Sequence, residues 1–301
     1  MQTVTVVERA SAQVLRSVTS MLDEEFVFRK QRTLSFSRRF PGVFCPDNAS
    51  NTFVVRDQER ILSSVTVKRA RLLFHRRVLE FAMVGGVCTM PDARGNGLAS
   101  CILRHLGLVL AEEGVDFAVL WTTSPGFYER LGWQAADNSV FGTLVRRFPK
   151  VSAPEVSHGP LVPQDMVLLE AIRACILPGR VIREAVDYQT IPLPAEEVER
   201  FAVEEASGWS AYALVGRLND TGYVYEVVGE TEALPSIWAA IGDAYQTVYV
   251  NDCAGSPSAR WLDTQELVCF TPKNLAMWRI ISSRIAMEQI QDLYVPFLDR
   301  I

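Results

Sequence analysis

The chain has 301 residues, of which 49% are hydrophobic and 22% are charged, a composition typical of a folded globular protein and not of a disordered one. No apolar run approaches the roughly 18 residues that a membrane span needs, and no basic segment precedes an apolar stretch near residue 1. We therefore expect neither a membrane association nor a signal peptide.

The six cysteines are scattered without a C-x-x-C pair, and the three histidines are dispersed. This pattern predicts reduced thiols in a cytoplasmic protein and no metal site. Residues 1–150 carry 20 Lys and Arg against 14 Asp and Glu, whereas residues 151–301 carry 10 against 21, within a total of -5. A basic first half suits a polyanionic ligand, and an acidic second half favours a cationic substrate or partner.

The first half reads as a mixture of strands and helices. Apolar spacing predicts a strand at residues 3–8, a helix at 11–26, and a hairpin of strands at 52–56 and 61–68. The most basic segment, 68–77, is interpreted as a solvated hairpin end and not as a nucleic-acid patch, because the acidic second half would repel a nucleic-acid backbone. Buried strands are expected at 79–90 and 117–122, a short helix at 125–131, and a closing strand at 141–147.

The strand at 79–90 leads into a glycine turn and then into a helix with apolar residues at helical spacing, which Gly114 ends. The turn reads Arg94-Gly95-Asn96-Gly97-Leu98-Ala99. Several backbone N–H groups lack partners at such a helix start, and glycines let a ligand approach the backbone closely. The expected ligand is a phosphate. The dinucleotide fingerprint and the P-loop motif are both absent.

The turn fits the pattern [RQ]-x-x-G-x-[GA], and a second signature follows at residues 124–133. With these two motifs, in this order, the chain resembles the GNAT superfamily of N-acetyltransferases. The resemblance implies a mixed central sheet flanked by helices in residues 1–148, an α/β (α+β) class. It also implies acetyl-coenzyme A as acyl donor. The residues implied to bind it are Val87, Cys88, Thr89, Arg94, Gly95, Asn96, Gly97, Leu98, Ala99 and Ser124.

The resemblance also implies catalytic roles. The pantetheine arm would enter where the central strand splays from its neighbour, and Gly85-Gly86 fits a bulge there. Tyr128 is the expected general acid, because a phenol can protonate the departing thiolate. The general base is left open between Glu80, the only carboxylate on the central strand, Glu24 or Glu25, and the carboxylate of Ile301. The Ile301 carboxylate is suggested by the mycobacterial enhanced-intracellular-survival acetyltransferases.

Four prolines mark a linker at residues 149–163. Beyond it we expect helices at 164–174, 196–205, 233–243 and 275–290, a hairpin of 211–217 with 223–229, and strands at 247–251 and 266–271. This order repeats the first half, but no arginine-glycine turn follows Gly229. Residues 164–301 are therefore interpreted as a smaller, degenerate GNAT-like domain, or another α+β domain, that covers the acceptor side.

The sequence thus predicts an acetyl-CoA-dependent N-acetyltransferase acting directly on a primary amine of a cationic small molecule. A protein lysine or N-terminal acetyltransferase is the alternative within the enzyme class. A non-catalytic acetyl-CoA-binding regulatory protein is the alternative outside it. Nucleic acid is not an expected partner, and the oligomeric state is left open.

Overall fold

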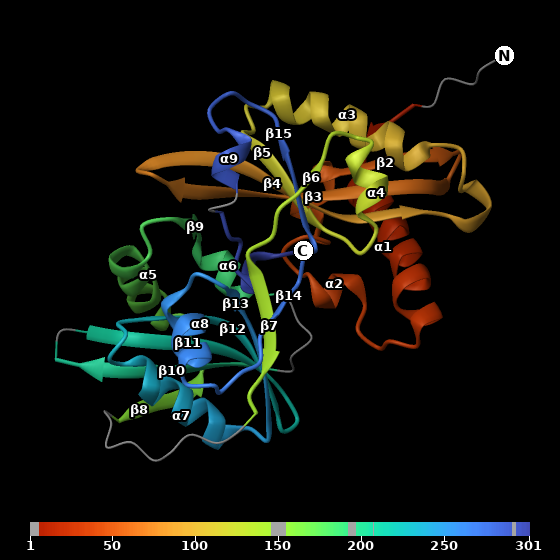
Figure 1. Cartoon of the computed structure of the whole chain (residues 1–301). Coiled ribbons are helices and arrows are strands. Elements are labelled where there is room, and N and C mark those ends of the chain that lie inside the picture. The colour runs from red at the N-terminus through yellow and green to blue at the C-terminus, as the bar shows by residue number, and fades with distance from the viewer. Residues whose placement is uncertain (1–5, 146–154, 192–196, 207, 291–292) are drawn as a thin grey trace.

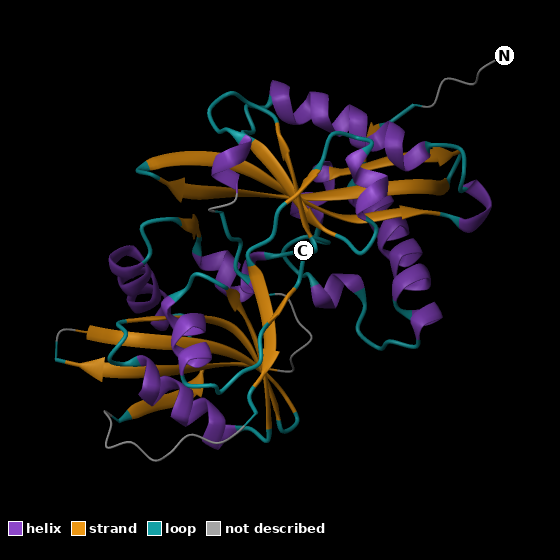
Figure 2. Cartoon of the chain, in the orientation of Figure 1, coloured by secondary structure: helices purple, strands orange, loops and turns teal. Residues whose placement is uncertain are grey.

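The computed structural model describes residues 6–145, 155–191, 197–206, 208–290 and 293–301. Two sheets lie one above the other, and the end of the chain lies between them (Figure 1). Both halves combine helices with strands (Figure 2). Within the described residues no helix is long and apolar enough to cross a membrane, and no cluster of His, Cys, Asp or Glu could hold a metal ion.

The first sheet has the strand order β1-β2-β3-β4-β5-β15-β6, and β9 pairs with β3. Its strands are β1 (Glu8–Arg9), β2 (Thr52–Asp57), β3 (Arg60–Phe74), β4 (Arg77–Thr89), β5 (Phe117–Trp121), β6 (Gln134–Ala135), β9 (Arg180–Ile182) and β15 (Ala276–Ile280). Helices α1 (Ala12–Phe26), α2 (Phe36–Arg39), α3 (Leu98–Glu112) and α4 (Pro125–Glu129) accompany them. The expected helix at 11–26 and hairpin at 52–68 are confirmed; of the expected strand at 3–8, residues 3–5 lie outside the described part.

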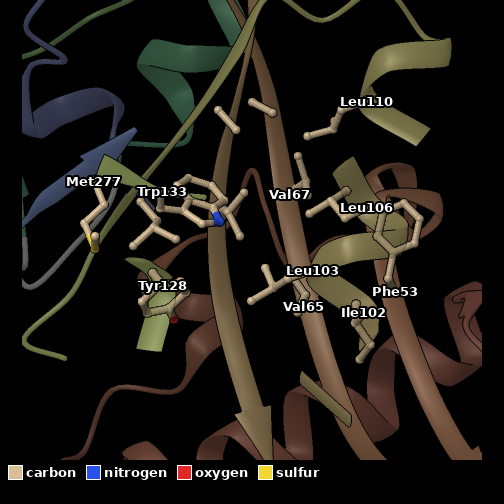
Figure 3. Packing of buried hydrophobic residues seen from close by; sticks show 14 of the residues in the cluster. Phe53, Val65, Val67, Ile102, Leu103, Leu106, Leu110, Tyr128, Trp133 and Met277 are labelled. Carbon is tan, nitrogen blue, oxygen red and sulfur yellow. The ribbon is translucent and has the colours of Figure 1, made fainter. Parts of the chain in front are cut away.

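The core of the first sheet forms between its strands and α3 (Figure 3). Ile102, Leu103 and Leu106 of α3 are buried against Phe53 and Val65 of β2 and β3. The residues recur every three to four positions, so one face of the helix covers the sheet. Each such side chain contributes about 1.5–3 kcal/mol through its removal from water. This packing fixes the start of α3 beside the end of β4.

The second sheet has the order β14-β7-β13-β12-β11-β10-β8. Its strands are β7 (Ser139–Thr143), β8 (Val156–Pro160), β10 (Glu197–Glu205), β11 (Gly208–Leu218), β12 (Thr221–Gly229), β13 (Thr247–Cys253) and β14 (Thr271–Pro272). The helices of this half are α5 (Asp165–Ile176), α6 (Ala185–Gln189), α7 (Leu234–Ala244), α8 (Pro257–Thr264) and α9 (Met287–Ile290). The hairpin β11–β12, helix α7 and strand β13 are as expected from the sequence.

The two halves exchange strands. β15, from the C-terminal half, lies between β5 and β6 of the first sheet. β7, which we expected to close the first domain, pairs instead with β13 and β14 of the second sheet. The carboxylate of Asp137, between β6 and β7, accepts hydrogen bonds from the backbone N–H groups of Leu275 and Ala276. Each sheet is therefore completed by a segment of the other half.

Four further expectations are wrong. Of the strand expected at 266–271, only Thr271 lies in a strand, the short β14, and Val268 forms an isolated bridge with Leu144. The segment 196–205, expected to be helical, forms β10 from Glu197 onward, because it pairs on both sides with β11 and β8. The helix expected at 275–290 is the strand β15 followed by a turn and the short α9. The linker expected at 149–163 contains β8 at its end, on the edge of the sheet where proline is tolerated. Residues 146–154 lie outside the described part.

Candidate active site

An opening in the first sheet lies between β4 and β5. These parallel strands pair only at Phe81↔Phe117, Ala82↔Ala118 and Met83↔Val119. Beyond Met83, the remaining residues of β4 have no partner on β5. The β3–β4 ladder shifts register between Ser64 and Thr66, and Gly86 has φ +57° there. A bulge and a separation of strands therefore occur together, as the glycine pair predicted.

The glycine turn connects this opening to α3. Gly95 and Gly97 have φ values of +83° and +72°, which favour glycine, and a Cβ at either position would meet no atom within 4 Å. Gly97 caps α3 without any side-chain hydrogen bond to the first turn. The N–H groups at the start of this 15-residue helix therefore face open space, which is the arrangement that binds phosphate groups.

A cavity of about 550 Å³ lies along the turn. Six of the predicted binding residues line it, namely Thr89, Arg94, Gly95, Gly97, Leu98 and Ala99. Arg104 of α3 and Arg130, directly after α4, also line it, and neither forms an ion pair within the described residues. Sequence reasoning missed both arginines, although Arg104 follows the turn on the exposed face of the helix. Open space at the glycines and two unpaired cations fit a pyrophosphate.

Arg94 is held in place by its own contacts. Its guanidinium pairs with the buried carboxylate of Glu25 at 2.7 Å, and its Nε donates to the carbonyl of Thr89 at 3.1 Å. These contacts tie the turn to α1 and to the end of β4. Arg94 therefore shapes the turn, and its side chain is already occupied.

The other predicted binding residues do not line this cavity. Val87 and Cys88 lie on the part of β4 that faces the opening, and burial raises the pKa of the Cys88 thiol to about 11. The side chain of Asn96 donates to the carbonyl of Ala93, within the turn. Ser124 caps α4, where its N–H donates to Thr122. Cys88 is thus an inert thiol at physiological pH.

Tyr128 lies on α4 at the open end of β4 and β5. It is 9% exposed and packs edge-on against Phe127. It also packs edge-on against Trp133 (Figure 3). Burial raises the pKa of Tyr128 to about 12. The phenol therefore stays protonated throughout the physiological range and can donate a hydrogen bond.

Ile301 lies on β4. A methyl group placed on Gly85 would come within 2.9 Å of its Cγ1 and 3.7 Å of its carbonyl carbon. Gly85 is two residues from Val87, roughly 7 Å along the strand. Ile301 also packs against an apolar cluster that contains Phe36, Phe40 and Phe44.

Glu80 and Glu24 lie elsewhere. Glu80 is exposed at the other end of β4, about 23 Å along the strand from Val87. Glu24 is exposed and pairs with Arg29. The third alternative, Glu25, is occupied by Arg94. Of these four alternatives for the general base, only Ile301 meets two conditions among the described residues. It lies at the opening, and no cation is paired with its carboxylate.

A buried ion cluster, Arg173, Arg183, Glu226 and Asp299, holds the last segment of the chain. Arg183 donates to both oxygens of Asp299 at 2.8 Å and to both oxygens of Glu226 at 2.8 and 2.6 Å. Burial alone would raise the pKa of Glu226, but the charges of Arg183 and Arg173 and the hydrogen bonds from Arg183 and Tyr212 outweigh it and lower the value to about 2. Asp299 is two residues before Ile301. The ion cluster therefore fixes Ile301 against β4. The sequence shows no local signal for it.

The family model of the acetyltransferase (GNAT) domain matches residues 10–136. Residues 10–136 form a GNAT domain. This segment contains the opening, the glycine turn and α4. No curated protein matches the sequence.

Solved structures extend the likeness to both halves. A conserved Enterococcus faecalis protein, described as a probable N-acyltransferase, is 18% identical with a TM-score of 0.75, over 93% of this chain and 73% of that one. A GCN5-related N-acetyltransferase of Anabaena variabilis is 14% identical with a TM-score of 0.71, over 92% and 73%. N-myristoyltransferase of Saccharomyces cerevisiae, solved with myristoyl-CoA, is 11% identical with a TM-score of 0.59, over 93% and 80%.

These likenesses establish the fold. The mixed GNAT-like sheet predicted from the sequence is confirmed, and the second sheet is compatible with a tandem arrangement.

Proposed function

We propose that the chain is an acetyl-CoA-dependent N-acetyltransferase that transfers the acetyl group directly to a primary amine. The observation that carries this proposal is the continuity of three features: the opening between β4 and β5, the glycine turn, and a cavity lined by Arg104 and Arg130. An extended thioester with a pyrophosphate matches all three. The opening takes its amide-bearing arm, and the turn takes its phosphates.

The residues of the opening have defined roles in this proposal. The backbone of Val87–Thr89 pairs with the amides of the arm and donates N–H groups to the acetyl carbonyl, where negative charge develops. The N–H groups of Gly95 to Ala99 hold the pyrophosphate, and Arg104 and Arg130 neutralise its charge.

When bound, the thioester supplies an activated acetyl carbon and a thiolate leaving group. The carboxylate of Ile301 accepts a proton from the amine, which frees the nitrogen lone pair for attack. Tyr128 donates its phenolic hydrogen to the departing sulfur. These two proton transfers are the general base and general acid steps.

The proposed acceptor is a cationic small molecule. The aromatic rings of Phe36, Phe40 and Phe44 lie in the cluster against which Ile301 packs, and aromatic faces attract cations. The net negative charge of residues 151–301 also attracts a cationic acceptor.

We propose no nucleic-acid partner, because three of the five Lys and Arg residues in the segment 68–77 are paired with carboxylates of the chain. Lys68 pairs with Asp187 at 3.3 Å and Arg71 pairs with Glu184 at 3.1 Å.

All six cysteines are free thiols, which supports the proposed cytoplasmic location.

The test is a thiol-release assay with acetyl-CoA and a panel of amines. The panel comprises a polyamine, an aminoglycoside, a lysine-containing peptide and a neutral monoamine of similar size. We expect release above the hydrolysis background with the polycations, and a product heavier by one acetyl group in mass spectrometry. Release with the peptide alone would contradict the small-molecule acceptor. Acetyl-CoA binding without transfer to any amine would contradict the enzyme assignment.

A further inference from the structure

The second sheet contains an opening like that of the first. β12 and β13 are parallel and pair only from Thr221↔Thr247 to Val224↔Val250. The β11–β12 ladder shifts register between Leu214 and Val215, directly beside the point of separation. β13 keeps β7 as its neighbour on the other side, up to Cys253↔Ser139. The separation of parallel strands and the bulge thus occur together in both sheets.

A cavity of about 1060 Å³ occupies this second opening. The run Tyr225 to Gly229 on β12 forms one wall, and the run Asn251 to Ser258, from β13 into α8, forms the other. The turn between β3 and β4, with His75 and Arg76, closes it from the first half. The size is that of a site for a small organic ligand. From Glu226 to Gly229, β12 pairs with β11 on one edge, but β13 does not pair with it on the other.

The cavity is not a second coenzyme A site. After Gly229 the chain continues with Glu230 and Glu232, and Pro235 occupies the first turn of α7, where it removes an N–H donor. Gly255 lines the cavity and has open space around it, but it does not have the positive φ of Gly95 and Gly97, so the phosphate turn of the first half has no counterpart among the described residues here. The ligand of this cavity therefore carries no pyrophosphate.

The cavity is lined by four arginines and by two carboxylates, Glu226, which is paired with Arg183, and Asp252, which accepts a hydrogen bond from Ser256. The excess of arginines favours an anionic group on the ligand. Arg76, Arg180 and Arg260 line the cavity, and none of the three forms an ion pair within the described residues. Arg173 also lines it, but it is paired with Glu170 and Glu226 and belongs to the buried ion cluster. Unpaired guanidinium groups bind carboxylates in bidentate fashion.

The remaining walls are apolar. Leu72, Phe74, Leu177, Leu234 and Leu293 line the cavity between the charged groups. A free strand edge selects an extended chain of amides, because its N–H and C=O groups pair with those of a peptide. Apolar walls select apolar side groups.

We propose that this cavity binds a short apolar peptide with a free terminal carboxylate, which lies along Glu226 to Gly229 as an added strand. The carboxylate is held by Arg76, Arg180 and Arg260, which line the cavity. This site is separate from the acetyl-CoA site, and its existence does not depend on the proposed transferase activity.

The test is isothermal titration of the full chain with the tripeptide Ala-Val-Ala, and with the same peptide as its C-terminal amide. We expect one tripeptide to bind per chain, and the amide to bind at least about 10-fold more weakly, because a charged hydrogen bond is lost. Arg260→Ala should weaken binding of the free peptide to a similar extent. Arg16→Ala, an exposed arginine outside the cavity, is the matched control and should bind like the wild type.

Ala254→Trp provides an independent variant, because Ala254 is exposed at the mouth of the cavity and its side chain supports no core. This variant should lose peptide binding and keep the thermal shift with acetyl-CoA. Absence of peptide binding to the wild type at about 1 mM, equal affinity for the peptide and its amide, or unchanged binding in Ala254→Trp would each overturn the proposal. None of these outcomes bears on acetyl-CoA binding, so the two proposals fail separately.

Discussion

The buried Glu226 predicts a specific pH dependence of stability. Its pKa is about 2 in the folded protein, against an ordinary value of 4.5. A carboxyl group with a lowered folded pKa stabilises the protein above its ordinary pKa and loses that contribution as the pH falls toward the folded value. The difference of about 2.5 units corresponds to about 3 kcal/mol, because one unit is worth about 1.4 kcal/mol. About 2 kcal/mol of it should be lost between pH 6 and pH 3.

The perturbation is Glu226→Gln, which keeps the shape of the side chain and removes its charge. Urea unfolding followed by tryptophan fluorescence at pH 6, 5, 4 and 3 gives the free energy of unfolding of both proteins. Titrations common to both cancel in their difference. We expect the variant to be less stable at pH 6, and the difference to shrink by about 2 kcal/mol at pH 3.

Glu232→Gln is the matched control, because Glu232 is exposed in the same half. Its difference from the wild type should be small and should not change with pH. A difference between the wild type and Glu226→Gln that stays constant from pH 6 to pH 3 would refute the reasoning. It would mean that the cluster around Arg183 does not hold Glu226 ionised.

Three further predictions concern the first opening. Tyr128→Phe should lower kcat by about 10²–10⁴-fold, the usual scale for a general acid, with little change in the Kd for acetyl-CoA; full activity in the thiol-release assay would remove Tyr128 from the mechanism. Two glycines added after Ile301 should also lower kcat by about 10²–10⁴-fold, because they displace the terminal carboxylate. Unchanged turnover would exclude the carboxylate of Ile301 as the base. Arg104→Ala should weaken acetyl-CoA binding with a reduced salt dependence in isothermal titration, whereas Arg16→Ala should bind like the wild type.

The first opening could be predicted from the sequence because its determinants are local. Gly95 and Gly97 need positive φ, Gly86 marks the bulge, and the apolar face of α3 follows within one helix. These residues lie within a stretch of about 25 positions, and each has a conformational or packing requirement that its residue type reveals.

The exchange of strands could not be predicted in this way. β15 pairs with β5 at Ala276↔Trp121, between segments far apart in the sequence. A short run with Ala276, Met277 and Trp278 all buried has no alternation, so its pattern does not distinguish a strand from a helix. The helix expected in place of β10 was wrong for a similar reason. The glutamates of β10 favour a helix locally, but pairing with β11 on one edge and β8 on the other makes the segment a strand.

The position of Ile301 is also a property of the whole fold. It depends on Arg183, Glu226 and Asp299, which come from three separate parts of the chain and meet only when both sheets have formed. Arg104 and Arg130 are intermediate cases. Each follows a recognised motif, but only the cavity shows that they converge.

The central claim is that the glycine turn at the start of α3 binds acetyl-CoA. Thermal unfolding with and without acetyl-CoA tests it in the wild type, Gly97→Val and Gly114→Val. Both glycines have positive φ, +72° and +74°, and open space around them, so both variants carry similar backbone strain at opposite ends of α3. We predict stabilisation of the wild type and of Gly114→Val by about 2.7 kcal/mol at 100 times the Kd, and none of Gly97→Val. No shift in the wild type, or an equal shift in Gly97→Val, would contradict the account.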